Sequence, residues 1–163
     1  MFLRIEDIPG EARDERHRNW IEVSAVNWAV ASGPFSHDRV SSPARFHDFT
    51  VAKAVDKSSP LLALACASGR MLKSVLIEFV YGNDRRALVF YKVRVSDVLV
   101  RTIKGRAISA GSGRTGTATF HEEVAFSFDE IVWFYQPGAT DTWPVSAGYS
   151  IKEGRALNGG NSG

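Results

Sequence analysis

Apolar residues recur at every second position through long parts of this chain, and no other feature constrains the fold as strongly. Successive side chains of a strand point to opposite faces of a sheet, so this alternation predicts strands with one buried side. Polar residues occupy the positions between, as Lys92, Arg94 and Ser96 do in LVFYKVRVS. The alternation slips near Asp97, which predicts a bulge or a bend there. The three apolar series are Val75, Ile77, Phe79 and Tyr81; Val89, Tyr91, Val93 and Val95; and Phe120, Val124, Phe126 and Phe128.

Four further segments have the composition of strands. They are FLRIEDI (2–8), WIEVSAVNWAV (20–30), FHDFTVAKAV (46–55) and IVWFY (131–135). The segment 20–30 is rich in β-branched and aromatic residues on both of its faces, so we expect both faces to be covered.

One segment, SSPLLALACASG, predicts a helix. Ser59 is placed to cap its start, Pro60 suits the first helical position and Gly69 ends it. Because the helix is short, its stability must come from packing against a sheet. The residues expected on or beside its apolar face are Leu61, Leu62, Leu64, Ala65 and Cys66.

A chain of 163 residues is long enough for one domain with a substantial core. Many short strands tend to close or to pack in two layers, because open sheet edges invite aggregation. We therefore predict a mainly β fold, a barrel or a sandwich with one docked helix, as a single domain over residues 1–150. The segment 31–46 is expected to be a long loop or arm. Residues 151–163 have little to bury and are expected to form a disordered tail.

The stretch GSGRTG (111–116) has the spacing G-x-G-x-x-G of dinucleotide-binding loops. In such sites the loop leads into a helix, whose N-terminus binds the pyrophosphate. Here the residues after Gly116 alternate with a period of two, which predicts a strand, and Thr117 stands where a P-loop has its lysine. We therefore interpret this stretch as a glycine loop between two strands rather than as a nucleotide site.

Other reactive residues also lack the spacing that chemistry requires. Ser36, His37 and Asp38 are adjacent, so on an extended chain they point to opposite sides and cannot form a triad locally. Cys66 falls within the apolar stripe of the helix and is expected to pack in the core. We predict no catalytic, cofactor-binding or metal-binding residue. Surface or loop positions, without the spacing of zinc ligands, are predicted for His17, His37, His47 and His121.

Charge and cysteine content restrict the partners and the compartment. The net charge of +2 is well short of the dense basic surface of a nucleic-acid-binding protein. Phe90 and Tyr91 fall on opposite faces of their strand, so they do not form a stacking platform for bases. The single cysteine allows no internal disulfide and suits synthesis in a reducing compartment. The first residues lack the layout of a cleaved signal peptide, and no apolar run is long enough to cross a bilayer.

Four segments, in order, carry a resemblance that covers nearly the whole chain, from Phe2 to Pro137. They are FLRIEDIPGEARDERHRNWIEV, FTVAKAVDKSSPLLALACASG, VSDVLVRTI and EEVAFSFDEIVWFYQP. In this order and spacing the chain resembles the hemolysin-coregulated protein (Hcp) family, which builds the inner tube of bacterial type VI secretion systems. The resemblance implies a two-sheet β-barrel with one flanking α-helix, assembled as a hexameric ring with an open lumen.

The resemblance also implies roles for individual residues. The arm 31–46 corresponds to an extended loop that reaches the adjacent ring, although prolines and arginines replace the family's glycine-rich stretch. The turn 82–84 corresponds to a rim loop, and Asn27 and Ser112 correspond to positions that face the lumen. The residues expected to take part in ring stacking are Gly33, Pro34, Phe35, Arg39, Pro43, Arg45, Gly82, Asn83 and Asp84.

By resemblance, the rings stack into a tube that is propelled into target cells and can carry and protect effectors. The implied partners are other copies of the chain, the contractile sheath, the baseplate, VgrG-type spike proteins and secreted effectors, without nucleic acid, cofactor or membrane insertion. The implied location is the bacterial cytoplasm, followed by secretion through the type VI machinery without a cleaved signal peptide. From the residues alone, two alternatives remain: a monomeric small β-barrel that binds ligands, and an enzyme with a scattered site.

Overall fold

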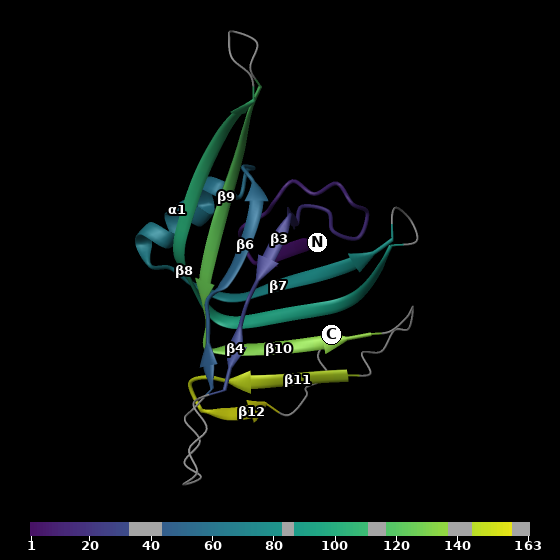
Figure 1. The fold of residues 1–163 in the computed structure, drawn as a ribbon, viewed down its shortest axis with the longest axis vertical. Helices are drawn as coiled ribbons and strands as arrows, with labels where there is room; N and C mark the ends of the chain where they lie inside the picture. The colour runs from purple at the N-terminus through teal and green to yellow at the C-terminus, as the bar shows by residue number, and fades with distance from the viewer. Residues whose placement is uncertain (33–43, 83–86, 111–116, 137–144, 158–163) are drawn as a thin grey trace.

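The computed structural model describes residues 1–32, 44–82, 87–110, 117–136 and 145–157 (Figure 1). Within these ranges the chain is mainly β with a single helix, as the sequence predicts. No helix in these ranges is long and apolar enough to span a membrane. The elements are β1 (Phe2–Ile5), β2 (Ile21–Glu22), β3 (Ala25–Asn27), β4 (Val30–Ala31), β5 (Arg45–Phe46), β6 (Phe49–Ala54), α1 (Ser59–Ser68), β7 (Met71–Tyr81), β8 (Leu88–Ala110), β9 (Thr117–Ser127), β10 (Glu130–Tyr135), β11 (Val145–Ser150) and β12 (Arg155–Leu157).

One long strand, β8, joins the two layers of the fold. Its first half lies between β7 and β10, in a layer that continues through β1 and β2 on one side and through β11 and β12 on the other. Its second half pairs with β9, which is followed by β6 and β3. In Figure 1 the strands of the first layer lie roughly horizontally, and those of the second layer lie roughly vertically. Strands β4 and β5 form a separate two-stranded ribbon.

The passage of β8 from one layer to the other involves a local irregularity. Asp97 has a φ of 52°, a left-handed conformation that aspartate tolerates better than most residues. The pairing of β8 with β9 then shifts register between Val100 and Thr102. The bulge or bend predicted near Asp97 is confirmed, and it is what turns a strand of 23 residues from one layer into the next.

The core lies between the two layers and is built from the alternating apolar series. Its members include Val75, Ile77, Val93, Val95, Val124 and Phe126, all buried. Tyr81 and Phe120, which belong to the same series, are instead exposed, because they stand near the ends of strands that extend beyond the facing layer. Alternation therefore predicted correctly which side of each strand faces the core, but it did not predict at which residue along the strand the burial ends.

The single strand expected over 20–30 is wrong in its extent. The segment is divided into β2, β3 and β4, which pair with β1, β6 and β5 respectively. It therefore passes across three neighbours instead of following one. Trp20 and Trp28, which made both faces look apolar, are each half-buried.

Helix α1 ends where the sequence predicts but is not capped as predicted. Gly69 adopts the left-handed conformation, with a φ of 63°, and its N–H points back to the last turn of the helix. At the other end Ser58, not Ser59, holds the capping position, and its side chain makes no capping hydrogen bond. The Ser59 hydroxyl instead accepts a hydrogen bond from the backbone N–H of Asp56.

The buried face of α1 also differs from the expected one. Leu62 and Ala65 are buried against the sheet, with Cys66 half-buried beside them. Leu61 and Leu64 were expected to pack on the same face as Ala65, but both are exposed. Since nearly every residue of this helix is apolar or small, the sequence pattern had no polar side from which the outer face could be recognised.

The tail departs in part from its predicted disorder. Residues 155–157 form β12, which pairs with β11 in a register that sets Leu157 opposite Gly148. The close pairing favours glycine at this place, because an added Cβ on Gly148 would lie 3.1 Å from Val132 Cγ2 and 3.2 Å from Leu157 Cβ. Residues 158–163 lie outside the described ranges, and the domain boundary at residue 150 stays a prediction.

Candidate functional site

Three of the residues predicted to serve in assembly lie in the described ranges. Asn27 is the last residue of β3, Arg45 is the first of β5, and Gly82 follows β7 with a φ of 93° that favours glycine. Asn27 and Arg45 lie on two chain segments that pair with each other as β3 with β6 and β4 with β5, whereas Gly82 lies at the far end of β7 (Figure 1). The other predicted assembly residues lie outside the described ranges: Gly33, Pro34, Phe35, Arg39, Pro43, Asn83, Asp84 and Ser112.

Asn27 belongs to a sheet face made of small side chains. In the register of β3, β6 and β9, Asn27 stands opposite Thr50 and Ala25 opposite Ala52, while Thr50 in turn stands opposite Ala125. Residues directly opposite in antiparallel strands share a face, so these five side chains form one continuous surface. Ala25 and Asn27 are exposed, Thr50 and Ala52 are half-buried and Ala125 is buried, and none of the five is a large apolar group.

Farther along β9 and β8 the same face becomes charged. Glu123 stands opposite Ala52 on one side and Lys104 on the other, and the Lys104 Nζ is 3.9 Å from Glu123 Oε1. Arg106 stands opposite His121 in the next pair along. An exposed pair at this separation contributes little to stability, so these charges mainly set the electrostatics of the surface. The described part of the face carries both signs of charge.

A shallow groove of about 580 Å³ opens beside Asn27. Its lining includes Trp28, Phe46, Asp48 and Thr50, from β5, β6 and the residues that connect the β4–β5 ribbon to β3 and β6. The groove is open to solvent, unlike the enclosed clefts that bury most of a small ligand. It therefore gives little support to the alternative of a monomeric ligand-binding barrel.

The most buried charged group of the described chain is Lys53, on β6. Its ammonium lies 2.7 Å from Glu122 Oε1 on β9, 2.7 Å from Asp56 Oδ1 and 3.0 Å from Ser59 Oγ. It also donates to the backbone carbonyl of Ala54 at 2.8 Å. The three side-chain partners come from β9, from the turn before the helix and from the first residue of α1. This buried lysine network therefore fixes the start of the helix on the sheet.

The network is satisfied internally and is not arranged for catalysis. A serine beside a lysine is a known pair for nucleophilic chemistry. Here, however, Lys53 has no exposed surface, and the Ser59 hydroxyl donates to Glu122 at 2.7 Å. Burial raises the pKa of Asp56, but hydrogen bonds from Lys53 and Ser58 outweigh this effect, so its pKa lies below the usual value. A substrate would have no access to the hydroxyl.

His17 overturns one of the histidine predictions. It is buried, with its ring stacked on Phe2 at a centroid distance of 4.1 Å. Its Nδ1 lies 2.6 Å from Asp14 Oδ1 and its Nε2 lies 3.0 Å from Glu78 Oε2. The other oxygen of Glu78 is 2.9 Å from Lys92 Nζ. Carboxylates therefore lie within hydrogen-bond distance of both ring nitrogens of His17.

This buried histidine fastens the loop before β2 to the sheet. Asp14 lies on the loop, while Glu78 and Lys92 lie on β7 and β8. Burial raises the pKa of Asp14, but hydrogen bonds from the His17 side chain and from backbone N–H groups outweigh this effect and hold its pKa below the usual value. His47 and His121 are exposed as predicted, and His37 lies outside the described ranges.

The described strands on either side of the glycine loop agree with its interpretation as a strand connection. From Thr102 opposite Ala125 onward, strands β8 and β9 pair in regular register up to Ala110 opposite Thr117, so the loop joins two antiparallel neighbours and leads into a strand. A dinucleotide site would require a helix after the loop. In the parts of the chain that the structure covers, no group of three or more histidine, cysteine or acidic side chains could hold a metal ion.

Comparison with known proteins identifies relatives over almost the full length of the chain. A protein-family model described as "Type VI secretion system effector, Hcp" matches residues 2–135. A curated relative, Protein hcp1 of Pseudomonas aeruginosa, is 28% identical over 160 residues, which cover 94% of this chain and 95% of the relative.

Solved structures share the fold of this chain. Hcp1 from Salmonella typhimurium has a TM-score of 0.75 and 24% identity, with 96% of this chain and 97% of that chain covered. A type VI secretion system effector from Yersinia pestis has a TM-score of 0.67 and 30% identity, with 92% and 98% covered. A structure described as a type six secretion system protein has a TM-score of 0.80 at 20% identity, with 96% and 98% covered.

Proposed function

The chain belongs to the Hcp family of type VI secretion systems, and we propose that it is the subunit of hexameric rings that stack into the inner tube. The observation that carries the proposal is the family match over residues 2–135, which includes both layers of the sheet and the helix. In this role the chain performs no chemistry of its own, and its work is to build a hollow, rigid assembly.

The small-residue face around Asn27 is the surface that we assign to the lumen. A channel that holds a protein cargo and later releases it needs a wall without large apolar side chains, since these would bind the cargo tightly. Alanine, threonine and asparagine on β3 and β6 meet that need. Ser112, which lies outside the described ranges, is proposed for the same wall. The mixed charges near Lys104 and Glu123 would face the same channel.

Ring stacking is proposed for the two segments predicted from the sequence. The β4–β5 ribbon carries Arg45 and leads into the arm, whose residues 33–43 lie outside the described ranges. Gly82 begins the proposed rim loop at the end of β7. The tube would be tipped by a VgrG-type spike, assembled on a baseplate and driven by a contractile sheath. Effectors carried in the lumen would leave the bacterial cytoplasm with the tube.

Light scattering coupled to size-exclusion chromatography tests the ring directly. We expect a mass near six times that of the monomer, and negative-stain images that show annular particles with a central hole. A monomer at high protein concentration, in both low and moderate salt, would contradict the proposal and favour a small ligand-binding barrel. Because family membership already implies assembly, the same measurement also checks how far this chain follows its relatives.

A further inference from the structure

The outer face of α1 is an uncharged surface that this chain leaves uncovered. The ten residues of the helix, SPLLALACAS, include no charged side chain at all. Leu64 is 64% exposed and Leu61 is 38% exposed, while Met71, just after the helix, is 57% exposed. A helix that faces only water normally carries charged residues on its outer side. We call Leu61, Leu64 and Met71 the helix patch.

A second apolar surface lies where four strands end together. Tyr81 is 77% exposed and Phe90 39%, while Tyr135 and Val145 are exposed to a similar degree. Tyr135 stands directly opposite Val145, and the backbone N–H of Gln136 bonds to the carbonyl of Phe90, so the ends of β8, β10 and β11 are adjacent. Tyr81 pairs with Leu88 at the end of β7. We call Tyr81, Phe90, Tyr135 and Val145 the strand-end patch.

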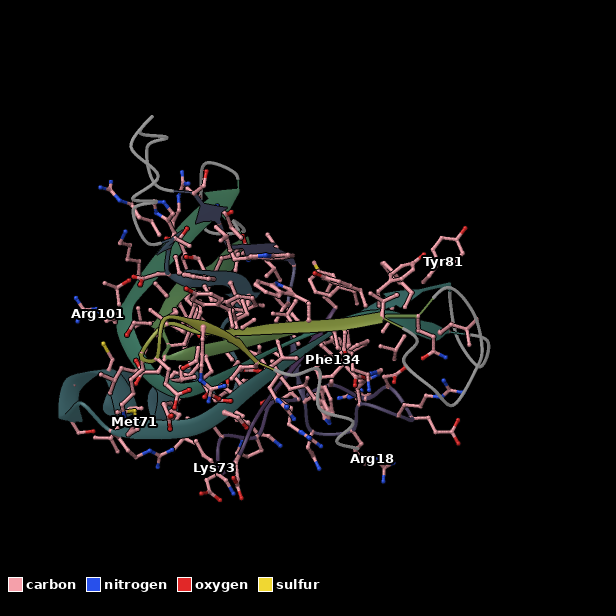
Figure 2. All side chains as sticks on the ribbon, turned by 90° about the horizontal axis from the view of Figure 1, so that it is seen from below. Arg18, Met71, Lys73, Tyr81, Arg101 and Phe134 are labelled. Atoms are coloured by element: carbon pink, nitrogen blue, oxygen red, sulfur yellow. The ribbon has the colours of Figure 1, made fainter. Side chains whose placement is uncertain are left out.

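The two patches lie on opposite flanks of the molecule. In Figure 1, α1 is at the left, whereas β7 ends and β8 begins at the right, beside the end of β10 and the start of β11. Figure 2, turned by 90°, again shows Met71 on the left and Tyr81 on the right. The views agree because the turn is about the horizontal axis. A line from one patch to the other therefore crosses the whole domain.

We propose that the helix patch of one copy packs on the strand-end patch of the next copy, and that this contact closes the ring. This inference rests on the proposed function and assigns its interface. A cyclic assembly needs a heterologous contact between two different surfaces of the same chain, placed on opposite flanks. Both patches are apolar, so their contact would remove apolar surface of both copies from water, which is favourable.

A second copy is a better occupant than an unrelated partner because it accounts for both patches at once. Each copy would use its helix patch on one neighbour and its strand-end patch on the other. After closure, neither surface would remain exposed in any subunit. A different partner on either patch would leave the second one uncovered, and exposed apolar patches on soluble proteins generally mark interaction sites.

Single substitutions at the two most exposed positions test the pairing. We expect Leu64→Asp and Tyr81→Asp each to shift the protein from ring to monomer at concentrations where the unmodified chain forms rings. Both side chains point into solvent, so each variant should keep the far-ultraviolet circular dichroism spectrum of the parent. Leu64→Met and Tyr81→Phe keep the apolar surface and should still form rings.

Mixing the two charged variants distinguishes a paired contact from two unrelated ones. Leu64→Asp keeps an intact strand-end patch and Tyr81→Asp keeps an intact helix patch. In an equimolar mixture, the helix patch of Tyr81→Asp can therefore still pack on the strand-end patch of Leu64→Asp, whereas the remaining patch of each variant is blocked. We expect one-to-one heterodimers at high concentration and no larger species. If the two patches did not contact each other, the mixture would contain only monomers or would rebuild rings, and either result would overturn the inference.

A footprint of the unmodified protein gives an answer that does not depend on the folding of any variant. Hydroxyl-radical oxidation should modify Leu64 and Tyr81 several-fold less in the oligomer than in diluted monomer. Rings in which both residues remain fully reactive would refute the interface and leave the proposed function standing. An unmodified chain that stays monomeric under all conditions would refute the proposed function itself.

Discussion

At the scale of single residues, the least expected feature is that charged groups are buried at two separate places. The sequence contained a signal for one of them: Glu122 occupies the inward phase of a series that otherwise holds Phe120, Val124 and Phe126. A charge in an apolar phase predicts a buried partner. It does not reveal that the partner is Lys53, 69 positions away, because strand pairing between β6 and β9 brings the two together.

Loss of the buried lysine should be costly. Lys53→Met would leave Glu122 buried without its cation, and removal of one partner of a buried pair usually costs about 3–5 kcal/mol of unfolding free energy. Lys104→Met is the matched control, because Lys104 also faces a glutamate of β9 but across an exposed gap of 3.9 Å. Its cost should stay within about 0.5 kcal/mol. Urea titration measures both values, and equal costs for the two variants would contradict the argument.

The acid sensitivity of the fold should depend on Asp56. Its pKa is lowered in the folded protein, so between that value and the ordinary value of 3.8 the unfolded chain binds more protons than the folded one. Stability from this group is therefore complete above pH 3.8 and is lost as the pH falls through the folded pKa. Asp56→Asn should reduce the slope of unfolding free energy against pH in that acidic window. Asp14, whose pKa is also lowered, should preserve part of the slope. An unchanged slope would show that Asp56 is not linked to folding.

At the scale of elements, the sequence predicted strand phase well and strand extent poorly. The alternating series identified the inner faces of β7, β8 and β9, because burial on one side imposes a period of two. The segment 20–30 contains no comparable break in composition, yet it forms three short strands, since its partners lie in different parts of the sheet. The outer face of α1 was missed because the helix has no polar residue between its two terminal serines to mark that face.

The end of α1 should be sensitive to the loss of its glycine. Gly69→Ala would force a side chain into a left-handed conformation, with a φ of 63°, and should cost about 1 kcal/mol. Gly105→Ala is a matched control, because an added Cβ meets nothing within 4 Å at either position and Gly105 has no left-handed φ. Thermal unfolding should show a lower midpoint for the first variant only. A comparable loss in both would argue against the conformational explanation.

At the scale of the whole molecule, family and fold could be identified from the sequence, whereas the surfaces used in assembly could not. Predicted assembly residues such as Arg45, Gly82 and Asn27 came from resemblance, and only their positions in the fold are described. The helix patch and the strand-end patch had no sequence signal of their own. Exposed and buried apolar residues look alike in a sequence, and only packing separates them.

Shortening of the arm should separate two kinds of assembly. Replacement of residues 33–43 by a short glycine linker leaves both apolar patches and the β4–β5 pairing partners in the chain. We therefore expect isolated rings of unchanged mass that stack less readily into tubes, as seen by negative-stain imaging. Loss of the ring itself would show that the arm serves the contact between neighbours within a ring. Unchanged tube length would show that it serves neither contact.

The continuity of β8 has a mechanical consequence for the proposed tube subunit. The same covalent backbone belongs to both layers, so a force applied to one layer passes into the other without crossing a loop. The two layers cannot slide past each other as separate plates, because the strand that joins them is hydrogen-bonded along both halves. A subunit of this construction should resist shear between its two layers as one unit, with the bend near Asp97 as the corner at which the layers meet.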